Sequence, residues 1–512
     1  MAYPTVVLIP LCVPGHLTSM LEAGKRLLAT SRCPMSLTVL VTQMTMSANL
    51  MSDVADIIRR EAADSAFDIR FVHLPAVELP TAADGLEDFM MRFIQLHDTY
   101  VKEAVSGISS PVAAVVIDYF CTTLLDVTRE LALPVYVYLT SGASMLALLL
   151  RLPALDEEIA GDFEAMGEAA AVDLPGMPPV PARLMPTPIM TKNANFTWLV
   201  YHGNRFMEAA GIIVNTVAEL EQSILAAIAD GLCVPGRRAP TVYPIGPVVM
   251  PVNKQPAAGG DGEQLQHECV RWLDAQPPAS VVLLCFGSMG GSFPSPQVRE
   301  IADALEHSGH RFLWVLRGPI PADSKYPTDA DLDELLPEGF LERTKGRGLV
   351  WPKWAPQKDI LASPAVGGFV THCGWNSILE SLWHGVPLVP WPLFAEQHLN
   401  AFELVSVMGV AVAMKVDRKR GNLVEAAELE RVVRSLMGGS EEEGRKAREK
   451  ATEAKDLCRK AVADGGSSAA SLQELAREIG EHREHQGRTE ATPPLPQQVR
   501  YAAATLGAAR HG

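Results

Sequence analysis

Short apolar runs recur along the first half of the chain, and amphipathic stretches separate several of them. This alternation is typical of βαβ units built around a parallel sheet. Most of the runs are largely apolar, as expected of strands that helices cover on both faces. The predicted strands are 5–11, 36–42, 68–74, 111–117, 135–139 and 212–215, and the predicted helices are 18–29, 124–131 and 143–152.

The alternation stops at residues 248–264, where Pro, Gly and polar residues occur without periodicity, as in an exposed linker. Beyond it, Ser295 is expected to cap a helix that begins at Pro296 and ends at His307. Further strands are predicted at 280–286, 312–316, 348–350, 367–371 and 386–390, with helices at 358–362 and 376–384. The sequence therefore predicts an α/β protein with two Rossmann-like, doubly wound domains that face a cleft.

The last part of the chain changes character twice. Residues 441–460 read as a charged helix whose i,i+4 acid–base pairs keep one face in water. A final helix over 461–481, apolar at Leu472, Leu475 and Ile479, is expected to pack back on the N-terminal domain. Residues 482–512 are polar and are expected to form a disordered tail. The predicted domains are therefore 1–247 and 265–460, joined by the linker 248–264.

Composition narrows the possible partners. The 512 residues are 48% hydrophobic and 20% charged, enough for more than one core. Forty-four Lys and Arg against 60 Asp and Glu give a net charge of −16, which disfavours nucleic acid as a partner. No run of ~18 apolar residues suggests a transmembrane segment. Eight scattered cysteines without a CxxC pair are typical of reduced thiols, so we expect a cytoplasmic protein, and we expect a monomer.

A candidate anion site follows the strand that ends at Thr371. His372, Cys373 and Gly374 form a turn there, and a helix opens near Asn376. A helix N-terminus behind such a turn presents free backbone N–H groups and a partial positive charge, which suit a phosphate. Ser377 adds a hydroxyl and His372 an imidazole. Taken alone, the same residues also fit a purely structural turn.

Neighbouring residues offer partners for further chemical groups beside a phosphate. Glu380, one turn into the same helix, can accept the two hydroxyls of a ribose, as acidic residues do in dinucleotide folds. Trp354 offers a flat face on which a base can stack; alternatively, it packs in the core. Glu396 and Gln397 follow the next strand and suit sugar hydroxyls.

The first half supplies a candidate base. His16 follows the first predicted strand, and Asp118 ends the fourth, so both lie at carboxyl ends of strands, where α/β sheets bind ligands. Separately, His16 can be a helix-capping or surface histidine, and Asp118 can form an Asx turn. Together they form a base and the carboxylate that orients it. Thr140, after the strand 135–139, is a candidate ligand of a sugar hydroxyl or a simple strand-end hydroxyl.

Residues 354–397 resemble the complete signature box of the plant family 1 UDP-dependent glycosyltransferases. The resemblance extends in layout over roughly 5–480, including Cys285–Ser288, Pro337–Phe340 and the Gly-Gly-Ser-Ser turn at 465–468. It implies two Rossmann-like domains of the GT-B type, with a UDP-sugar bound mainly by the C-terminal one. The UDP-sugar is then a co-substrate, and no cofactor or metal is expected. The acidic run of Asp329, Asp331 and Asp333 is interpreted as a solvated loop.

The resemblance also implies a role for each matched residue. His16 stands where the family keeps its catalytic base, with Asp118 as its partner. The donor-binding residues implied are Trp354 and the Ala355 backbone for uracil, Gln357 and Glu380 for ribose, Ser288, His372, Asn376 and Ser377 for the diphosphate, and Trp375, Glu396, Gln397 and Thr140 for the sugar. Trp375 favours a neutral hexose, and Gln397 favours glucose over galactose.

The expected function is inverting transfer of a hexose to a hydroxyl of a small aromatic acceptor such as a flavonoid or other phenolic. UDP-galactose as donor, C-glycosylation, and a non-catalytic nucleotide-sugar-binding protein stay open as alternatives. A nicotinamide oxidoreductase is disfavoured because residues 287–292 do not form a GxGxxG fingerprint, and a hydrolase is disfavoured because no GxSxG occurs.

The acceptor pocket is expected to be built by loops at 75–100 and 180–205, because loops vary most within a fold. Four aromatic residues in these stretches either line the pocket or pack beneath the loops: Phe89, Phe93, Phe196 and Trp198.

Overall fold

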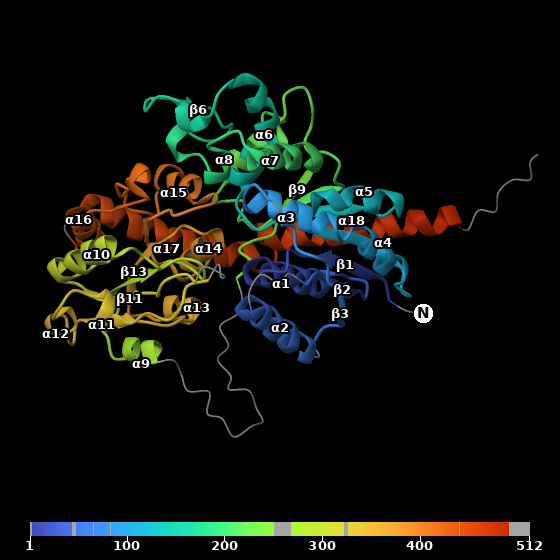
Figure 1. The fold of residues 1–512 in the computed structure, drawn as a ribbon. Coiled ribbons are helices and arrows are strands. Elements are labelled where there is room, and N and C mark those ends of the chain that lie inside the picture. Colours follow the sequence, from blue (N-terminus) through green and yellow to red (C-terminus); the bar gives the residue numbers. More distant parts are fainter. Residues whose placement is uncertain are drawn as a thin grey trace, which may run out of the picture.

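The computed structural model describes residues 3–43, 48–64, 66–81, 83–249, 268–321, 326–439 and 441–490. Within these ranges the chain forms two α/β domains, which lie side by side in Figure 1. The predicted fold class, with two Rossmann-like domains, is confirmed. Residues 250–264 of the predicted linker and 491–512 of the predicted tail lie outside the described residues.

The N-terminal sheet has seven parallel strands in the order β3-β2-β1-β4-β5-β8-β9. The strands are β1 (Thr5–Ile9), β2 (Ser36–Val41), β3 (Ile69–His73), β4 (Val112–Asp118), β5 (Val135–Leu139), β8 (Gly211–Val214) and β9 (Thr241–Pro244). β1 and β4, far apart in sequence, are neighbours with Ile9 opposite Ile117. The strand order reverses between β1 and β4, and in open α/β sheets ligands bind at such a point.

Helices cover both faces of this sheet, so β1, β2, β4, β5 and β8 are almost entirely buried, whereas the edge strands β3 and β9 are partly exposed. They are α1 (Pro14–Thr30), α2 (Ala48–Ala63), α3 (Leu86–Gln95), α4 (Asp98–Ser106), α5 (Leu125–Glu130), α6 (Ala143–Glu158), α7 (Ala194–Phe206) and α8 (Gln222–Ala229). Short 3-10 helices follow β4 as η1 (Tyr119–Leu124) and lie between α6 and α7 as η2 (Phe163–Ala165), η3 (Ala182–Leu184) and η4 (Thr187–Ile189), beside the small hairpin β6 (Ala171–Val172) and β7 (Val180–Pro181). Helices α6, α7 and α8 lie together at the top of Figure 1.

The C-terminal sheet has five parallel strands in the order β12-β11-β10-β13-β14. They are β10 (Val281–Cys285), β11 (Arg311–Val315), β12 (Gly348–Trp351), β13 (Val366–Thr371) and β14 (Leu388–Pro390). The helices are α9 (Glu268–Asp274), α10 (Ser295–Ser308), α11 (Leu332–Leu335), α12 (Phe340–Arg343), α13 (Gln357–Leu361), α14 (Trp375–His384), α15 (Gln397–Ser406), α16 (Ala426–Met437) and α17 (Glu442–Val462), with η5 (Arg418–Arg420) before α16. Its core consists of two apolar clusters, one on each face of β10 and β13.

The last helix, α18 (Ser467–Glu490), returns to the N-terminal domain (Figure 1). Leu472, Leu475 and Ile479 are buried in the cluster that contains Val6 and Leu8 of β1. The hydroxyls of Tyr136 in β5 and Tyr243 in β9 donate to Glu478. The expectation of a disordered tail from residue 482 is wrong for its first part, because the helix runs to Glu490.

Three further expectations need correction. The predicted exposed linker starts two residues too early, because Val248 and Val249 are buried and Arg26 donates to the Val249 carbonyl. Helix α10 begins at Ser295, so Pro294 and not Ser295 is its N-cap. The stretches 75–100 and 180–205, taken as loops, contain α3, the start of α4 and most of α7.

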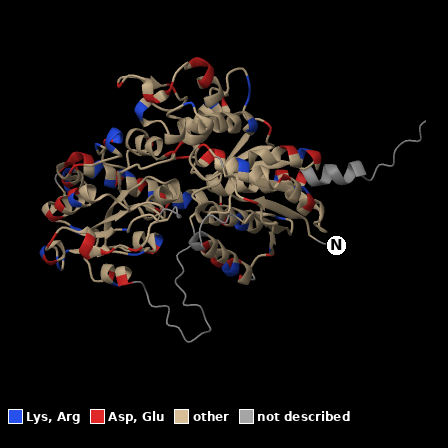
Figure 2. Cartoon of the chain, in the orientation of Figure 1, with Lys and Arg blue, Asp and Glu red and all other residues tan. Residues whose placement is uncertain are grey.

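Charged side chains of both signs are mixed over the outer helices (Figure 2). On α17, ion pairs join Glu442 to Lys446 and Arg445 to Glu449, four residues apart, as the sequence predicts for a solvated face. Buried alanines occupy the opposite face of this helix. Among the described residues, no helix is long and apolar enough to cross a membrane.

Candidate active site

His16 and Asp118 meet at the carboxyl edge of the N-terminal sheet. His16 lies in the first turn of α1, after β1, and Asp118 is the last residue of β4. Because β1 and β4 are neighbours, His16 Nδ1 and Asp118 Oδ2 are 2.7 Å apart. Asp118 Oδ1 also accepts a hydrogen bond from the backbone of Phe120, so the Asx turn and the pairing with histidine occur together.

The surroundings of the pair determine the protonation of His16. Burial disfavours the imidazolium, but the charge and hydrogen bond of Asp118 outweigh it and raise the pKa of His16 above its ordinary value. Asp118 is fully buried. A carboxylate beside Nδ1 accepts its proton, which leaves the lone pair of neutral His16 on Nε2. The ring lines a cavity, so Nε2 is the atom available to a substrate proton.

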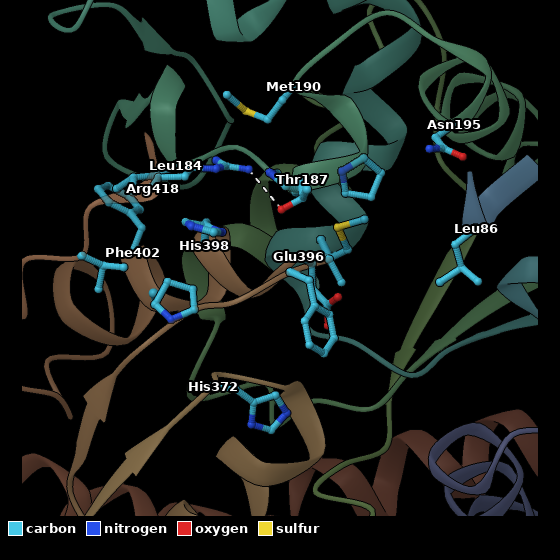
Figure 3. Close-up of a pocket in the computed structure, with 18 of the residues that line it drawn as sticks. Leu86, Leu184, Thr187, Met190, Asn195, His372, Glu396, His398, Phe402 and Arg418 are labelled. Atoms are coloured by element: carbon cyan, nitrogen blue, oxygen red, sulfur yellow. Dashed lines mark hydrogen bonds between the residues drawn. The ribbon is translucent and has the colours of Figure 1, made fainter. Parts of the chain in front are cut away.

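This cavity has a volume of about 1690 Å³ and lies between the two domains. Figure 3 shows Leu86 and Asn195 at one end, Arg418, His398 and Phe402 at the other, and Glu396 between them. Typical ligand pockets measure roughly 300–1,000 Å³. The cavity is therefore large enough for two ligands to meet in it.

A tight turn places His372 in the cavity from the C-terminal domain. The turn follows β13, and Cys373 in it adopts a positive φ of 66°. A Cβ at Gly287 or Gly374 would lie 2.7 or 2.5 Å from Nε2 of His372, so glycine is needed on both sides of this imidazole. Burial lowers the pKa of His372 to about 4, which keeps the ring neutral. Its Nδ1 has no hydrogen-bond partner within the described chain.

The N-terminus of α14 lies directly after this turn. Its second and third residues are Asn376 and Ser377, and Ser288, after β10, lines the same cavity as His372. The first N–H groups of a helix have no intrahelical partner and carry partial positive charge. This helix N-terminus, next to the cavity residue His372, therefore suits an anion.

A polar cluster lies one turn further along α14. Gln357 Nε2 donates to Ser377 Oγ at 2.9 Å and to Glu380 Oε2 at 2.8 Å. Burial raises the pKa of Glu380. Trp354, three residues before Gln357, is 55% exposed, and the next residue, Ala355, is buried. Gln357 and Glu380, the two side chains predicted to hold the ribose, are thus in contact, and Trp354, predicted to stack on uracil, has a large accessible surface.

Two other predicted residues, Trp375 and Gln397, use their side chains in contacts within the protein. The indole Nε1 of Trp375 donates to the carbonyl of Asn215 at 2.6 Å, and the ring packs against the N-terminal domain. Gln397 Oε1 accepts hydrogen bonds from the backbones of Leu393 and Phe394 at 2.9 and 3.0 Å. It therefore shapes the loop that carries Glu396.

Glu396 itself lines the cavity, and burial raises the pKa of its carboxyl. Thr140 follows β5 and is buried. Asn376 directs its amide across the domain boundary, donating to the Gly15 carbonyl at 3.4 Å. The acidic run at 329–333 is used locally: Asp329 pairs with Arg317, and Asp331 caps α11.

The aromatic residues considered for the acceptor pocket pack in the core instead. Phe93 and Phe196 are buried in the main cluster of the N-terminal domain, with Phe89 and Trp198 packed against it. Trp198 Nε1 donates to Asp88 Oδ1 at 2.8 Å. Their helical neighbours face the cavity, namely Leu86, Glu87, Met90, Asn195 and Leu199. The helical periodicity of 86–95 was the available signal that the sequence interpretation missed.

Comparison with known proteins agrees with this geometry. A family model described as UDP-glucoronosyl and UDP-glucosyl transferase matches residues 248–437. The malvidin galactosylase of Oryza sativa subsp. japonica is 58% identical over 488 residues, which cover 94% of this chain and 98% of that protein. The anthocyanidin 5,3-O-glucosyltransferase of a Rosa hybrid cultivar is 39% identical over 482 residues, covering 92% and 98%.

A solved structure extends the likeness to the fold. It is a complex between a UDP-glucosyltransferase from Polygonum tinctorium capable of glucosylating indoxyl and 3,4-dichloroaniline. It is 35% identical with a TM-score of 0.80, and the match covers 94% of this chain and 99% of that one. The chain therefore belongs to the plant family 1 UDP-dependent glycosyltransferases and is a UDP-glycosyltransferase.

Proposed function

We propose that this enzyme transfers a hexose from a UDP-sugar to a hydroxyl of a small aromatic acceptor, such as a flavonoid or another phenolic, with inversion at the anomeric carbon. The observation that carries the proposal is the His16–Asp118 pair, 2.7 Å apart, on the wall of a cavity that His372, Ser288 and Glu396 line from the other domain. A protein that only binds nucleotide sugars has no need of this pair, which disfavours the non-catalytic alternative.

The pair supports a single displacement. His16 Nε2 takes the proton of the acceptor hydroxyl while that oxygen forms a bond to the anomeric carbon. The bond from the anomeric carbon to the diphosphate oxygen breaks, and UDP leaves with the electron pair. Asp118 stabilises the imidazolium that forms and keeps Nε2 directed at the acceptor.

The donor is assigned to the C-terminal half of the cavity. The N-terminus of α14, Ser288 and neutral His372 provide hydrogen-bond donors where negative charge accumulates on the leaving diphosphate. Glu380 and Gln357 are assigned to the ribose and Trp354 to uracil. The UDP-sugar enters as a co-substrate, and the proposal needs no further cofactor.

Two sugars are candidates. Gln397 favours glucose through the family resemblance, whereas the name of the rice relative, malvidin galactosylase, favours galactose. Gln397 acts in the structure by holding the loop that presents Glu396. We therefore assign direct sugar contact to Glu396 and keep UDP-galactose as the second candidate donor.

The acceptor class rests on the cavity wall and on the relatives. Leu86, Met90 and Met190 give the N-terminal half of the cavity an apolar surface. Aromatic ligands are commonly bound by such surfaces with a few polar groups. The names of the rice and rose relatives refer to malvidin and anthocyanidin acceptors. We further infer that the enzyme acts in the cytoplasm as a monomer.

The test is a matrix of donors and acceptors. The purified chain is incubated with UDP-glucose or UDP-galactose and a panel of flavonoids and simple phenols. UDP release together with a hexose mass gain on the acceptor supports the proposal, and product NMR distinguishes O- from C-attachment. Absence of both signals across the panel would refute it. Gel filtration and a fluorescent fusion test the monomer and the cytoplasmic location.

A further inference from the structure

Asn215 is a fully buried residue at the junction of the two domains. It directly follows β8 at the carboxyl edge of the N-terminal sheet. Its carbonyl accepts the indole N–H of Trp375 at 2.6 Å, and its side-chain Oδ1 accepts the backbone N–H of Val248 at 2.8 Å. Its Nδ2 lies 3.4 Å from Asn376 Oδ1 and 3.5 Å from Ser19 Oγ. Every hydrogen-bonding group of the side chain is thus in use.

These contacts join the two helices that carry the reaction. Ser19 lies on α1, one turn after His16. Trp375 and Asn376 are the first two residues of α14, whose N-terminus faces the proposed diphosphate position. Asn376 Nδ2 in turn donates to the carbonyl of Gly15, the residue before His16. The N-termini of α1 and α14 are therefore linked through one chain of amide groups.

We propose that Asn215 is a positioning residue that sets the separation between His16 and the anomeric carbon. This inference rests on the proposed function, because it assumes that α1 carries the base and α14 holds the donor. Asn215 touches neither substrate. It acts by fixing Asn376 and Trp375 relative to Gly15, and a misplacement of about 1 Å between reacting groups can slow a reaction roughly a hundredfold.

The chemistry of asparagine explains why this residue type is needed. Val248 N–H requires an acceptor, and Asn376 Oδ1, opposite, requires a donor. An amide provides one of each in the same plane. Aspartate has the same shape and keeps the acceptor for Val248, but presents a second oxygen to Asn376. If the Asn376 amide turned to meet it, an oxygen would then face the Gly15 carbonyl. The substitution therefore loosens the link between the helices while the rest of the junction is kept.

The test compares Asn215→Asp with the wild type in the full chain. The rate of transfer is measured in a single turnover at saturating UDP-hexose, and UDP affinity is measured by calorimetry. We expect the single-turnover rate to fall roughly tenfold to a hundredfold and the Kd for UDP to change less than about threefold. Asn204→Asp, an exposed site on α7 in the same domain, is the matched control and should behave as the wild type.

Each outcome decides the question. An unchanged single-turnover rate in Asn215→Asp would overturn the inference. Weaker UDP binding with an unchanged rate would also overturn it, because Asn215 would then only shape the donor site. If the Asp variant does not fold, Asn215→Ser, which keeps the carbonyl contact to Trp375, replaces it with the same expected rate loss. Wild-type chain that transfers no hexose would refute the proposed function itself, and the inference with it.

Discussion

Arg418 in the C-terminal domain donates a hydrogen bond from Nη2 to Oγ1 of Thr187 in the N-terminal domain, at 3.1 Å (Figure 3). Its Nη1 donates to the carbonyls of Arg183 and Met185 at 2.7 and 2.9 Å. The backbone N–H of Thr187 donates to the carbonyl of Ala395, next to Glu396. One guanidinium thus ties residues 183–187 of the cavity wall to the C-terminal domain, which is proposed to hold the donor.

Replacing this guanidinium should weaken acceptor binding. Arg418→Lys keeps the charge but cannot reach three acceptors with a planar fork. A loss of about 1.4 kcal/mol of hydrogen bonding corresponds to roughly a tenfold rise in the acceptor KM, with UDP affinity unchanged. Initial rates at varied acceptor concentration give this KM, and Arg420→Lys, at an exposed site, is the control. An acceptor KM equal to that of the wild type would show that the contact has no part in acceptor binding.

Asp118→Asn should both slow the reaction and shift its pH dependence. The pKa of His16 is raised by Asp118, so in the wild type the active, neutral imidazole appears only as the pH rises through this raised value. Without the carboxylate the pKa of His16 falls, and the acidic limb of the rate profile moves to lower pH. The rate itself should fall about 10²- to 10⁴-fold because the tautomer is no longer fixed.

The measurement is the pH profile of kcat/KM with an acceptor whose hydroxyl does not ionise in the range studied. A limb that stays in place in Asp118→Asn would mean that another group than His16 titrates.

A buried carboxyl at the domain boundary makes stability depend on pH. Glu403 on α15 is fully buried, and Ser144 Oγ donates to its Oε2 at 2.5 Å. Burial, together with the charge of Glu221, raises the pKa of Glu403 well above its ordinary value. The folded protein therefore binds a proton that the unfolded chain has lost above its own pKa of ~4.3. The free energy of unfolding consequently falls as the pH rises through the raised pKa.

Glu403→Gln should remove this dependence, because an amide keeps the shape and has no proton to lose. The thermal stability of the variant minus that of the wild type should therefore be greater at pH 9 than at pH 6. Thermal midpoints at both pH values measure the effect, and Glu157→Gln, at an exposed site, provides the control. A pH dependence identical to that of the wild type would mean that Glu403 is already ionised in the folded protein.

Gly142, before α6, is closely approached by Trp375 of the C-terminal domain. A Cβ there would lie 2.6 Å from Cη2 of Trp375 and 3.0 Å from Glu221 Oε1. Gly142→Ala should therefore displace the indole and cost about 1–3 kcal/mol of stability. The displacement should also lower the transfer rate, because Trp375 is the first residue of α14, whose N-terminus is proposed to bind the diphosphate. Gly161→Ala, where an added Cβ meets nothing within 4 Å, is the matched control in thermal and rate measurements. Equal behaviour of the two variants would contradict this packing.

The pairing of distant residues followed from the sequence pattern. His16 and Asp118 are 102 positions apart, yet both were placed at carboxyl ends of parallel strands. In the structure, the order β3-β2-β1-β4-β5 makes β1 and β4 neighbours, and the two side chains therefore meet at the same edge of the sheet. The turn at 372–374 and the helix after it were likewise predicted, because a strand, a glycine and an amphipathic helix follow each other directly.

Contacts between the domains could not be predicted in this way. Nothing in the local pattern shows that Trp375 donates to Asn215, or that the amide of Gln397 holds its own loop. The residue type shows which hydrogen bonds a side chain can make. Which partner it contacts depends on how the two domains pack against each other. Helices α3 and α7 were taken as loops, so the residues that face the cavity, such as Glu87 and Met90, were missed.

In the proposed reaction, His16 is the base of a hexosyl transfer between the two domains. The most direct measurement compares the wild type with His16→Ala for UDP release that depends on a phenolic acceptor, with UDP affinity measured on the same samples. The wild type should transfer the hexose, and His16→Ala should be slower by about 10²- to 10⁴-fold with unchanged UDP affinity. If His16→Ala kept most of the wild-type turnover, His16 would not be the base.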